Sequence, residues 1–415
     1  MRRWPVAVVL AAAVAVSAGL LLAPRSLGGG DAAGCESVSQ RSAGVRCAAP
    51  VDAPVAVAAT IAPREDPPPV TAGGAVPTTA GGAPAAVVAP EPQLALPPAP
   101  DPDRPAELLD VTEPSPSLPN PFVRFVGDRY VMYTTEARDA VGAKQNVPVL
   151  ESTDLRTWSF VHDALPDGDV GAWAVPDATW APDVARIGGR WVLFYTARLA
   201  GHVPATQCIG GAAGTDATGP FTPAPEPIVC QLDRGGSIDP RSFRERDGTW
   251  WLHWKSDDNR EVDGTSTSSI YAQRLDPDGT ALVGEAHRIL EVSQPWEGRI
   301  VEAPQMVRAG ERLWLFYSAN WFNQPTYAIG VASCDTPAGP CTKPFDGPWL
   351  ASNAQGAGPG EGSLFLDRHG RWRLVYSPVA QQYRTQTDRP IALATVGFDA
   401  SGPYLADPRL ADPVR

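Results

Sequence analysis

One short phrase recurs five times along the chain, at intervals of about sixty residues. The copies read GDRYVMYTT, GGRWVLFYT, DGTWWLHWK, GERLWLFYS and HGRWRLVYS, and they begin at Gly127, Gly188, Asp247, Gly310 and His369. A turn that leads into an aromatic and aliphatic run is typical of a β-hairpin entering a buried strand. A unit of this length has room for about four strands, which favours a propeller blade over a helical solenoid.

The five copies predict an all-β fold, a five-bladed β-propeller of about four antiparallel strands per blade, covering residues 106–415. Residues 31–105 are rich in Pro and Ala and almost free of aromatic residues, so they predict a disordered linker that cannot bury enough surface to fold. Within residues 1–30, two arginines precede an apolar run from Val6 to Leu22, which predicts a signal peptide or an uncleaved membrane anchor.

The six cysteines indicate where the protein is located, and the net charge of −12 limits the partners it can bind. Nearest-neighbour pairing, with buried free thiols as the alternative, predicts the disulfides Cys208–Cys230, Cys334–Cys341 and, in the linker, Cys35–Cys47. We therefore expect a monomer that is secreted, or held at the cell surface by its N-terminal segment. The negative charge argues against nucleic acid and anionic membranes as partners. Scattered histidines and the lack of a Cys-x-x-Cys motif argue against a zinc site.

Acidic residues precede several copies of the phrase, where the innermost strand of each blade is expected to begin. Innermost strands converge on the axis of a propeller, so these side chains are predicted to share one small space. Crowded carboxylates raise the pKa of at least one member, and such a group can act as a general acid, for example on a glycosidic bond. Counting back from the phrases gives five matching positions: Asn120, Trp180, Asp239, Glu302 and Glu361.

Tryptophans near these positions are candidates for stacking on sugar rings, with packing between blades as the alternative for at least half of them. The candidates are Trp173, Trp180, Trp254, Trp296 and Trp321. The residues expected to contact a substrate are Trp180, Asp183, Trp254, Trp321 and Glu361.

Three segments together resemble glycoside hydrolase family 43, the five-bladed propeller enzymes that include arabinanases, arabinofuranosidases and xylosidases. They are WAPDV from Trp180, GSIDPRSFRERDG from Gly236 and PWEGRIVEAPQM from Pro295. The resemblance covers roughly residues 116–403. It implies inverting hydrolysis of an arabinose- or xylose-containing plant polysaccharide or oligosaccharide.

The resemblance also implies roles for single residues. Glu302 matches the general acid of the family, and Asp239 matches the carboxylate that raises the pKa of that acid and orients it. As alternatives, Asp239 could set a turn and Glu302 could pair with Arg299. Asn120 stands where the family carries the aspartate that serves as general base.

The asparagine opens a second function, a carbohydrate-binding propeller with impaired catalysis, because an amide cannot accept a proton at ordinary pH. Another carboxylate could replace the base, and the candidates are Glu113, Glu136, Asp183 and Glu361. A third reading is a propeller that serves protein contacts.

The fifth blade departs from the family as well. Gly360-Glu361-Gly362-Ser363 lacks the histidine that lies near a central metal ion in the family, so no metal ligand is assigned and no cofactor is required. An oxygen ligand could still hold calcium there. The Gly-rich run from Gly356 contains Pro359 and leads into a predicted strand, which argues against nucleotide binding.

Overall fold

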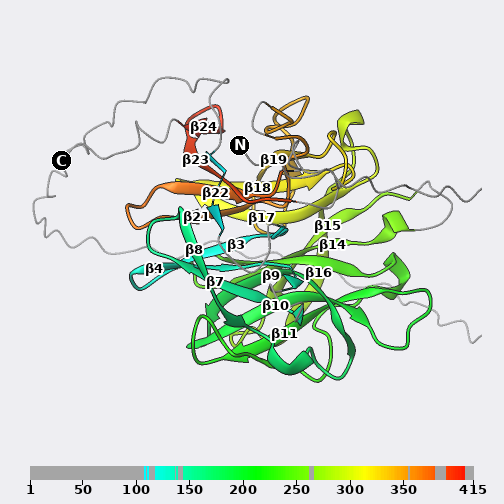
Figure 1. Cartoon of the computed structure of the whole chain (residues 1–415). Helices are drawn as coiled ribbons and strands as arrows, with labels where there is room; N and C mark the ends of the chain where they lie inside the picture. The colour runs from blue at the N-terminus through cyan, green and yellow to red at the C-terminus, as the bar shows by residue number, and fades with distance from the viewer. Residues whose placement is uncertain are drawn as a thin grey trace, which may run out of the picture. The chain divides into compact units, whose positions relative to one another are not determined.

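The computed structural model describes residues 107–108, 110–111, 117–135, 137–138, 144–260, 266–353, 356–378 and 389–406. They form five large β-sheets that follow one another along the chain (Figure 1), as predicted for an all-β protein. The predicted signal peptide or anchor, the linker and the Cys35–Cys47 pair lie outside the described residues. Among the residues that are described, no helix is long and apolar enough to cross a membrane.

The first three sheets each run from an inner strand outward in chain order. Blade 1 contains β3 (Phe122–Val126), β4 (Arg129–Tyr133), β7 (Pro148–Ser152) and β8 (Thr157–Asp163). Blade 2 contains β9 (Ala174–Ile187), β10 (Arg190–Leu199), β11 (Gln207–Gly214) and β12 (Thr222–Pro223). Blade 3 contains β13 (Ser237–Arg244), β14 (Trp250–Ser256), β15 (Ser269–Leu275) and β16 (Leu282–Glu291).

The last two sheets repeat this plan. Blade 4 contains β17 (Val301–Ala309), β18 (Arg312–Ala319), β19 (Ala328–Cys334) and β20 (Cys341–Thr342). Blade 5 contains β21 (Ser363–Leu366), β22 (Trp372–Tyr376), β23 (Ala392–Phe398) and β24 (Pro403–Ala406). A hairpin of β5 (Ala137–Arg138) and β6 (Lys144–Gln145) connects β4 to β7. The short 3-10 turns are η1 (Pro166–Gly168), η2 (Leu232–Arg234), η3 (Asp258–Arg260) and η4 (Pro295–Glu297).

The five blades close into a ring, which confirms the predicted five-bladed propeller. Their inner strands contact one another in the cycle β3, β9, β13, β17, β21 and back to β3. Five hydrophobic clusters make up the core, one between each pair of neighbouring blades. Middle strands such as β4 and β18 are buried at nearly every residue, because each blade is covered on both faces.

The N-terminal end of the propeller joins its last blade to its first. β1 (Glu107–Leu108) pairs antiparallel with β23 of blade 5, and β2 (Asp110–Val111) pairs in parallel with β8 of blade 1. The backbone N–H of Leu118 also donates to the carbonyl of Arg389 at 3.2 Å. These contacts tie together two blades that are far apart in the sequence.

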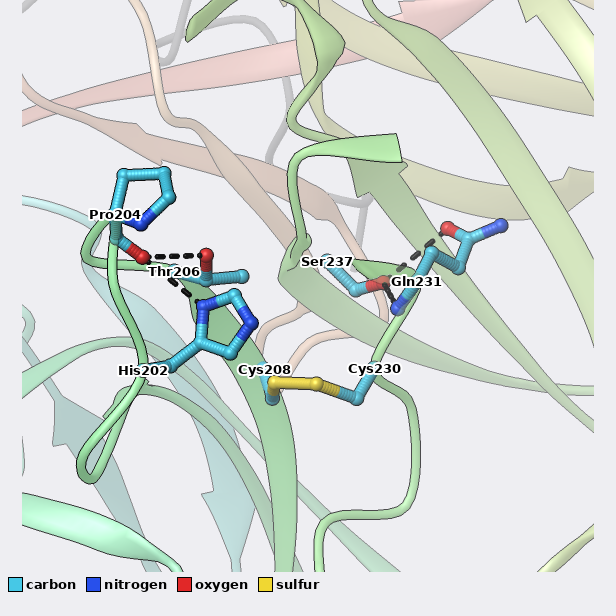
Figure 2. The surroundings of a disulfide bond; sticks show 7 residues. All are labelled: His202, Pro204, Thr206, Cys208, Cys230, Gln231 and Ser237. Carbon is cyan, nitrogen blue, oxygen red and sulfur yellow. Dashed lines mark hydrogen bonds between the residues drawn. A yellow bond between two sulfur atoms is a disulfide. The ribbon is translucent and has the colours of Figure 1, made fainter. Parts of the chain in front are cut away.

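Both disulfides predicted for the propeller are present. Cys334–Cys341 joins β19 to β20, and Cys208–Cys230 joins β11 to the segment before η2 (Figure 2). Gln231 follows the second of these disulfides, and its side-chain oxygen accepts hydrogen bonds from the Ser237 hydroxyl at 3.2 Å and from the Trp254 indole at 2.7 Å. The disulfide thus lies beside contacts that fix the start of β13.

Candidate active site

Each inner strand, or the segment just before it, contains a residue other than glycine whose backbone lies in the left-handed region. The φ angles of these five residues lie between 46° and 58°, and four of the five precede a proline. A positive φ is uncommon for residues other than glycine, so its recurrence at one place in every blade marks a built-in feature of the fold. The residues are Asn120, Ala181, Asp239, Ala303 and Glu361.

This geometry corrects the predicted equivalence of Asp239 and Glu302. Ala303 has the left-handed backbone that corresponds to Asp239, and Glu302 lies one residue earlier, where blade 2 has Trp180. The sequence comparison aligned Asp239 with Glu302 by counting back from the second strand of each blade. That count is misleading because the β17–β18 turn is shorter than the β13–β14 turn. The two acidic residues come from different positions in neighbouring blades, and they nevertheless interact electrostatically.

Glu302 is buried, and each of its carboxylate oxygens has a partner. Oε1 accepts a hydrogen bond from the hydroxyl of Tyr327 at 2.7 Å, and Oε2 lies 3.3 Å from Nζ of Lys255. Arg299, the alternative partner, instead donates to backbone carbonyls. Groups from blades 3 and 4 therefore fix the orientation of Glu302.

Asp239 is buried where blade 3 meets blade 4. Its Oδ2 accepts the backbone N–H of Ala303 at 2.9 Å, and its own N–H donates to Oγ1 of Thr196 at 3.0 Å. Burial raises the pKa of Asp239 to about 6; the charge of Glu302 adds to the rise and the charge of Lys255 opposes it. The two carboxyls thus interact electrostatically, as expected for a crowded acidic pair.

Glu361 adds a third buried carboxyl. Its backbone N–H donates to Oγ of Ser318 at 2.8 Å, and its Oε1 lies 3.3 Å from the Tyr327 hydroxyl. Its Oε2 is buried without a hydrogen-bond partner among the described residues. Burial raises the pKa of Glu361 to about 8 despite the opposing charge of Arg389, so the group is mostly neutral at pH 7.

Asn120 takes the corresponding place in blade 1. Its Oδ1 accepts the hydroxyl of Thr135 at 2.6 Å, and that hydroxyl also accepts the backbone N–H of Ala181 at 3.3 Å. The asparagine is therefore held in the same ring of left-handed residues as Asp239. Glu113 and Glu136, two of the proposed substitutes for a base, lie outside the described residues.

Asp183 is buried in β9 with partners of its own. Its Oδ2 accepts the hydroxyl of Ser242 at 2.5 Å. Burial raises the pKa of Asp183, and the charges of Arg124 and Arg241 oppose the rise. Because its exposed fraction is 1%, Asp183 is poorly placed for the substrate contact predicted from the sequence.

Among the described residues, those around Glu361 do not fit a central metal ion. Glu361 stands where the resemblance expects a histidine, and it interacts with the guanidinium groups of Arg389 and Arg241. Both guanidiniums are buried and bonded to backbone carbonyls, so a divalent cation placed beside them would meet fixed positive charge. In the described ranges, no three His, Cys, Asp or Glu side chains gather into a group that could hold a metal.

The candidate tryptophans divide into packed and accessible side chains. Three of them stack on tyrosines within the blades: Trp173 on Tyr195, Trp254 on Tyr271 and Trp296 on Tyr317. The exposed fraction of Trp254 is 1%, so it offers no ring face to a sugar, contrary to expectation. Trp321 is 45% exposed in the loop that leads from β18 to Tyr327, and Trp180 is half-buried next to Ala181.

Two residues of the site were missed by sequence reasoning. Lys255 ends the third copy of the repeated phrase, where the other copies end in Thr or Ser, so an alignment of the copies would have revealed it. Tyr327 lies outside every motif, 25 residues from the carboxylate it contacts, and carries no comparable signal.

Comparison with known proteins gives one family. The sequence profile described as "Glycosyl hydrolases family 43" matches residues 115–404. Xylosidase/arabinosidase 43A of Humicola insolens is 31% identical over 128 residues, which make up 31% of this chain and 34% of that protein. The matched region thus spans about a third of this curated relative.

Solved structures agree with this match. A thermostable family-43 glycoside hydrolase superimposes with a TM-score of 0.62 and 25% identity, over 70% of this chain and 93% of that one. An endo-1,4-beta-xylanase from Bacteroides thetaiotaomicron VPI-5482 superimposes with a TM-score of 0.59 and 25% identity, over 70% of this chain and 96% of that one. An exo-1,5-alpha-L-arabinanase from a bovine ruminal metagenomic library shares the fold. Its TM-score is 0.54 and its identity 20%, over 70% of this chain and 97% of that one.

Proposed function

Since the chain belongs to glycosyl hydrolases family 43, we propose that it is an exported glycoside hydrolase that cleaves xylose- or arabinose-containing plant glycans. Similar proteins carry the names xylosidase/arabinosidase and endo-1,4-beta-xylanase, which supports this class of substrate. The disulfides Cys208–Cys230 and Cys334–Cys341 support an oxidising compartment, hence secretion or attachment to the cell surface.

The observation that carries the proposal is the electrostatic interaction between the buried carboxyls of Asp239 and Glu302. In the proposed reaction, Glu302 donates a proton to the oxygen of the leaving sugar, while water attacks the anomeric carbon from the opposite face. Asp239, held by the N–H of Ala303, adds negative charge beside Glu302.

Asn120 supports a second candidate function, a carbohydrate-binding propeller with impaired turnover. The amide cannot take the proton of the attacking water, and general base catalysis contributes about 10²–10⁴-fold to rates. Glu361 is a poor substitute, because it and Glu302 contact the same Tyr327 hydroxyl at 3.3 and 2.7 Å, which keeps their nearest oxygens within about 6 Å. Inverting enzymes separate the two carboxyls by about 6.5–9.5 Å, so that water fits between carboxylate and sugar.

Two tryptophans are suited to hold the sugar in either function. Trp321 is exposed on the loop that leads to Tyr327, and Trp180 is half-buried at the blade 2 position that corresponds to Glu302. Aromatic rings with an open face stack on the apolar face of a sugar. We expect both rings to contact the glycan, whichever of the two functions holds.

The test compares the full chain with Asn120→Asp and Glu302→Ala on arabinan, xylan and aryl glycosides, by release of reducing sugar or phenol. Thr135 donates to Oδ1 of Asn120, so an aspartate fits the same place. A hydrolase shows turnover in the wild type that Glu302→Ala abolishes. Turnover confined to Asn120→Asp, together with glycan binding by the wild type in calorimetry, supports the binding protein. Neither turnover nor binding in any variant would refute both functions.

A further inference from the structure

Four of the five blades place a hydroxyl side chain near the end of their second strand or just after it. Backbone pairing with the inner strand defines this position in blades 2, 3 and 4. In blades 1 and 5 it is defined by backbone hydrogen bonds to the carbonyls of Pro119 and Gly360, which lie just before the inner strands. The last letter of each repeated phrase marks the same position. The residues are Thr135, Thr196, Lys255, Ser318 and Ser377, so blade 3 alone has a lysine.

The hydroxyl has a structural task that a lysine cannot perform. The N–H of Asp239 donates to the hydroxyl of Thr196 in the preceding blade, and the same type of bond joins blade 1 to blade 2 and blade 4 to blade 5. An ammonium group has no lone pair to accept such a bond. The N–H of Ala303 therefore donates to the carboxylate of Asp239 instead of to Lys255.

Lys255 makes different contacts. Its exposed fraction is 2%, and Nζ lies 3.0 Å from Oδ1 of Asp257 and 3.3 Å from Oε2 of Glu302. Burial of an ammonium is unfavourable by several kcal/mol unless opposite charges compensate it. The chain contains only three lysines, so the general composition does not account for one at this position. What the lysine adds is a fixed contact to the proposed proton donor.

We propose that Lys255 is a positioning residue for proton transfer from Glu302, an inference that rests on the proposed glycosidase function. Lys255 holds Oε2 of the carboxyl and the Tyr327 hydroxyl holds Oε1. The carboxyl can turn only by breaking one of these contacts, so its plane stays fixed relative to the scissile bond. Serine, the residue of blades 4 and 5 at this position, would leave Oε2 without this partner.

The test uses substrates that differ in their need for a proton. A sugar or alkyl alcohol leaves only when protonated, whereas 4-nitrophenolate leaves without this help. In the full chain, Lys255→Ser is expected to lower kcat/KM for xylobiose or arabinobiose by about 10- to 100-fold, and for the matching 4-nitrophenyl glycoside by less than about 3-fold. If the natural chain is too slow, the same comparison is made in the Asn120→Asp background.

Lys343→Ser is the matched control. Lys343 is half-buried, and its Nζ lies 2.6 Å from Oε1 of buried Glu297, so it pairs with a carboxylate other than the three of the site. Lys343→Ser is expected to lower the melting temperature and to leave the ratio of kcat/KM between the disaccharide and the 4-nitrophenyl glycoside unchanged. Equal losses on both substrates in Lys255→Ser, or no loss on either, would overturn the positioning role while leaving the hydrolase intact. Absence of turnover in both backgrounds would remove the proposed function and this inference together.

Discussion

The backbone N–H of Ala303 donates to Oδ2 of Asp239 at 2.9 Å, and this bond joins blade 4 to blade 3 beside Glu302. An asparagine oxygen could accept the same bond, so Asp239→Asn should fold like the wild type while removing the charge that acts on Glu302. We expect a loss of about 10²-fold or more in kcat/KM, measured on an oligosaccharide. Circular dichroism provides the check on folding, and near-normal activity in a folded variant would contradict the assigned role of Asp239.

Tight packing of Tyr327 on Gly360 gives the second prediction. A Cβ on Gly360 would lie 1.9 Å from Cε1 of Tyr327, so Gly360→Ala has to displace the ring whose hydroxyl bonds Glu302. Overpacking of this kind destabilises by about 1–3 kcal/mol. We expect a lower melting temperature and reduced turnover. Gly211→Ala is the control, because a Cβ there meets open space, and equal melting temperatures in the two variants would argue against this packing.

The Gly-rich run from Gly356 thus has a structural explanation that the sequence did not offer. The contact between Gly360 and Tyr327 depends on the path of the β18–β19 loop, which no residue pattern records. Trp254 was misassigned for a related reason, since alternation along a strand does not distinguish a face between blades from one open to a ligand. The five blades themselves were predictable, because every repeat has the same hairpin pattern and apolar run.

Sequence motifs were enough to single out Glu302 and Asp239 as site residues, but they did not predict the contacts that these two residues make. The bond from Ala303 to Asp239 exists because blade 3 lacks a hydroxyl at Lys255, a relationship between three segments that are distant in the sequence. The ring closure by β1 and β2 was also beyond sequence reasoning, because two residues per strand are too few to show a period.

The pKa of Glu361 predicts how stability changes with pH. Burial raises this pKa to about 8 from the ordinary 4.5, so the stability that protonated Glu361 contributes is fully present below pH 4.5 and is lost as pH rises from 4.5 to about 8. Glu361→Gln mimics the neutral acid and avoids this loss. Relative to the wild type, the variant should be equally stable at pH 4 and more stable at pH 9, by at least about 1 kcal/mol. Urea unfolding at both pH values measures the difference, and a gap that does not change with pH would contradict the prediction.

Replacing Arg241 should change stability in the direction opposite to that expected for Glu361→Gln. Its guanidinium donates to the carbonyl of Pro182 at 2.6 Å, and its charge acts on Asp183, Asp239 and Glu361. Removing the charge in Arg241→Met should raise the pKa values of these buried acids further. A folded-state pKa above the unfolded value means stability that is present at low pH and lost as pH rises. The variant should therefore fall further below the wild type as pH increases.

Thermal unfolding at pH 5 and pH 8 tests this prediction for Arg241→Met. The lost bond to Pro182 lowers the melting temperature at both pH values, whereas the lost charge adds a deficit that grows towards pH 8, where the acids must ionise. Arg246→Met is the control, because Arg246 pairs with Glu311 on the surface and such pairs contribute little. A deficit of the same size at pH 5 and pH 8 would mean that Arg241 serves packing and carbonyl contacts alone, and that the acids of the propeller axis do not depend on its charge.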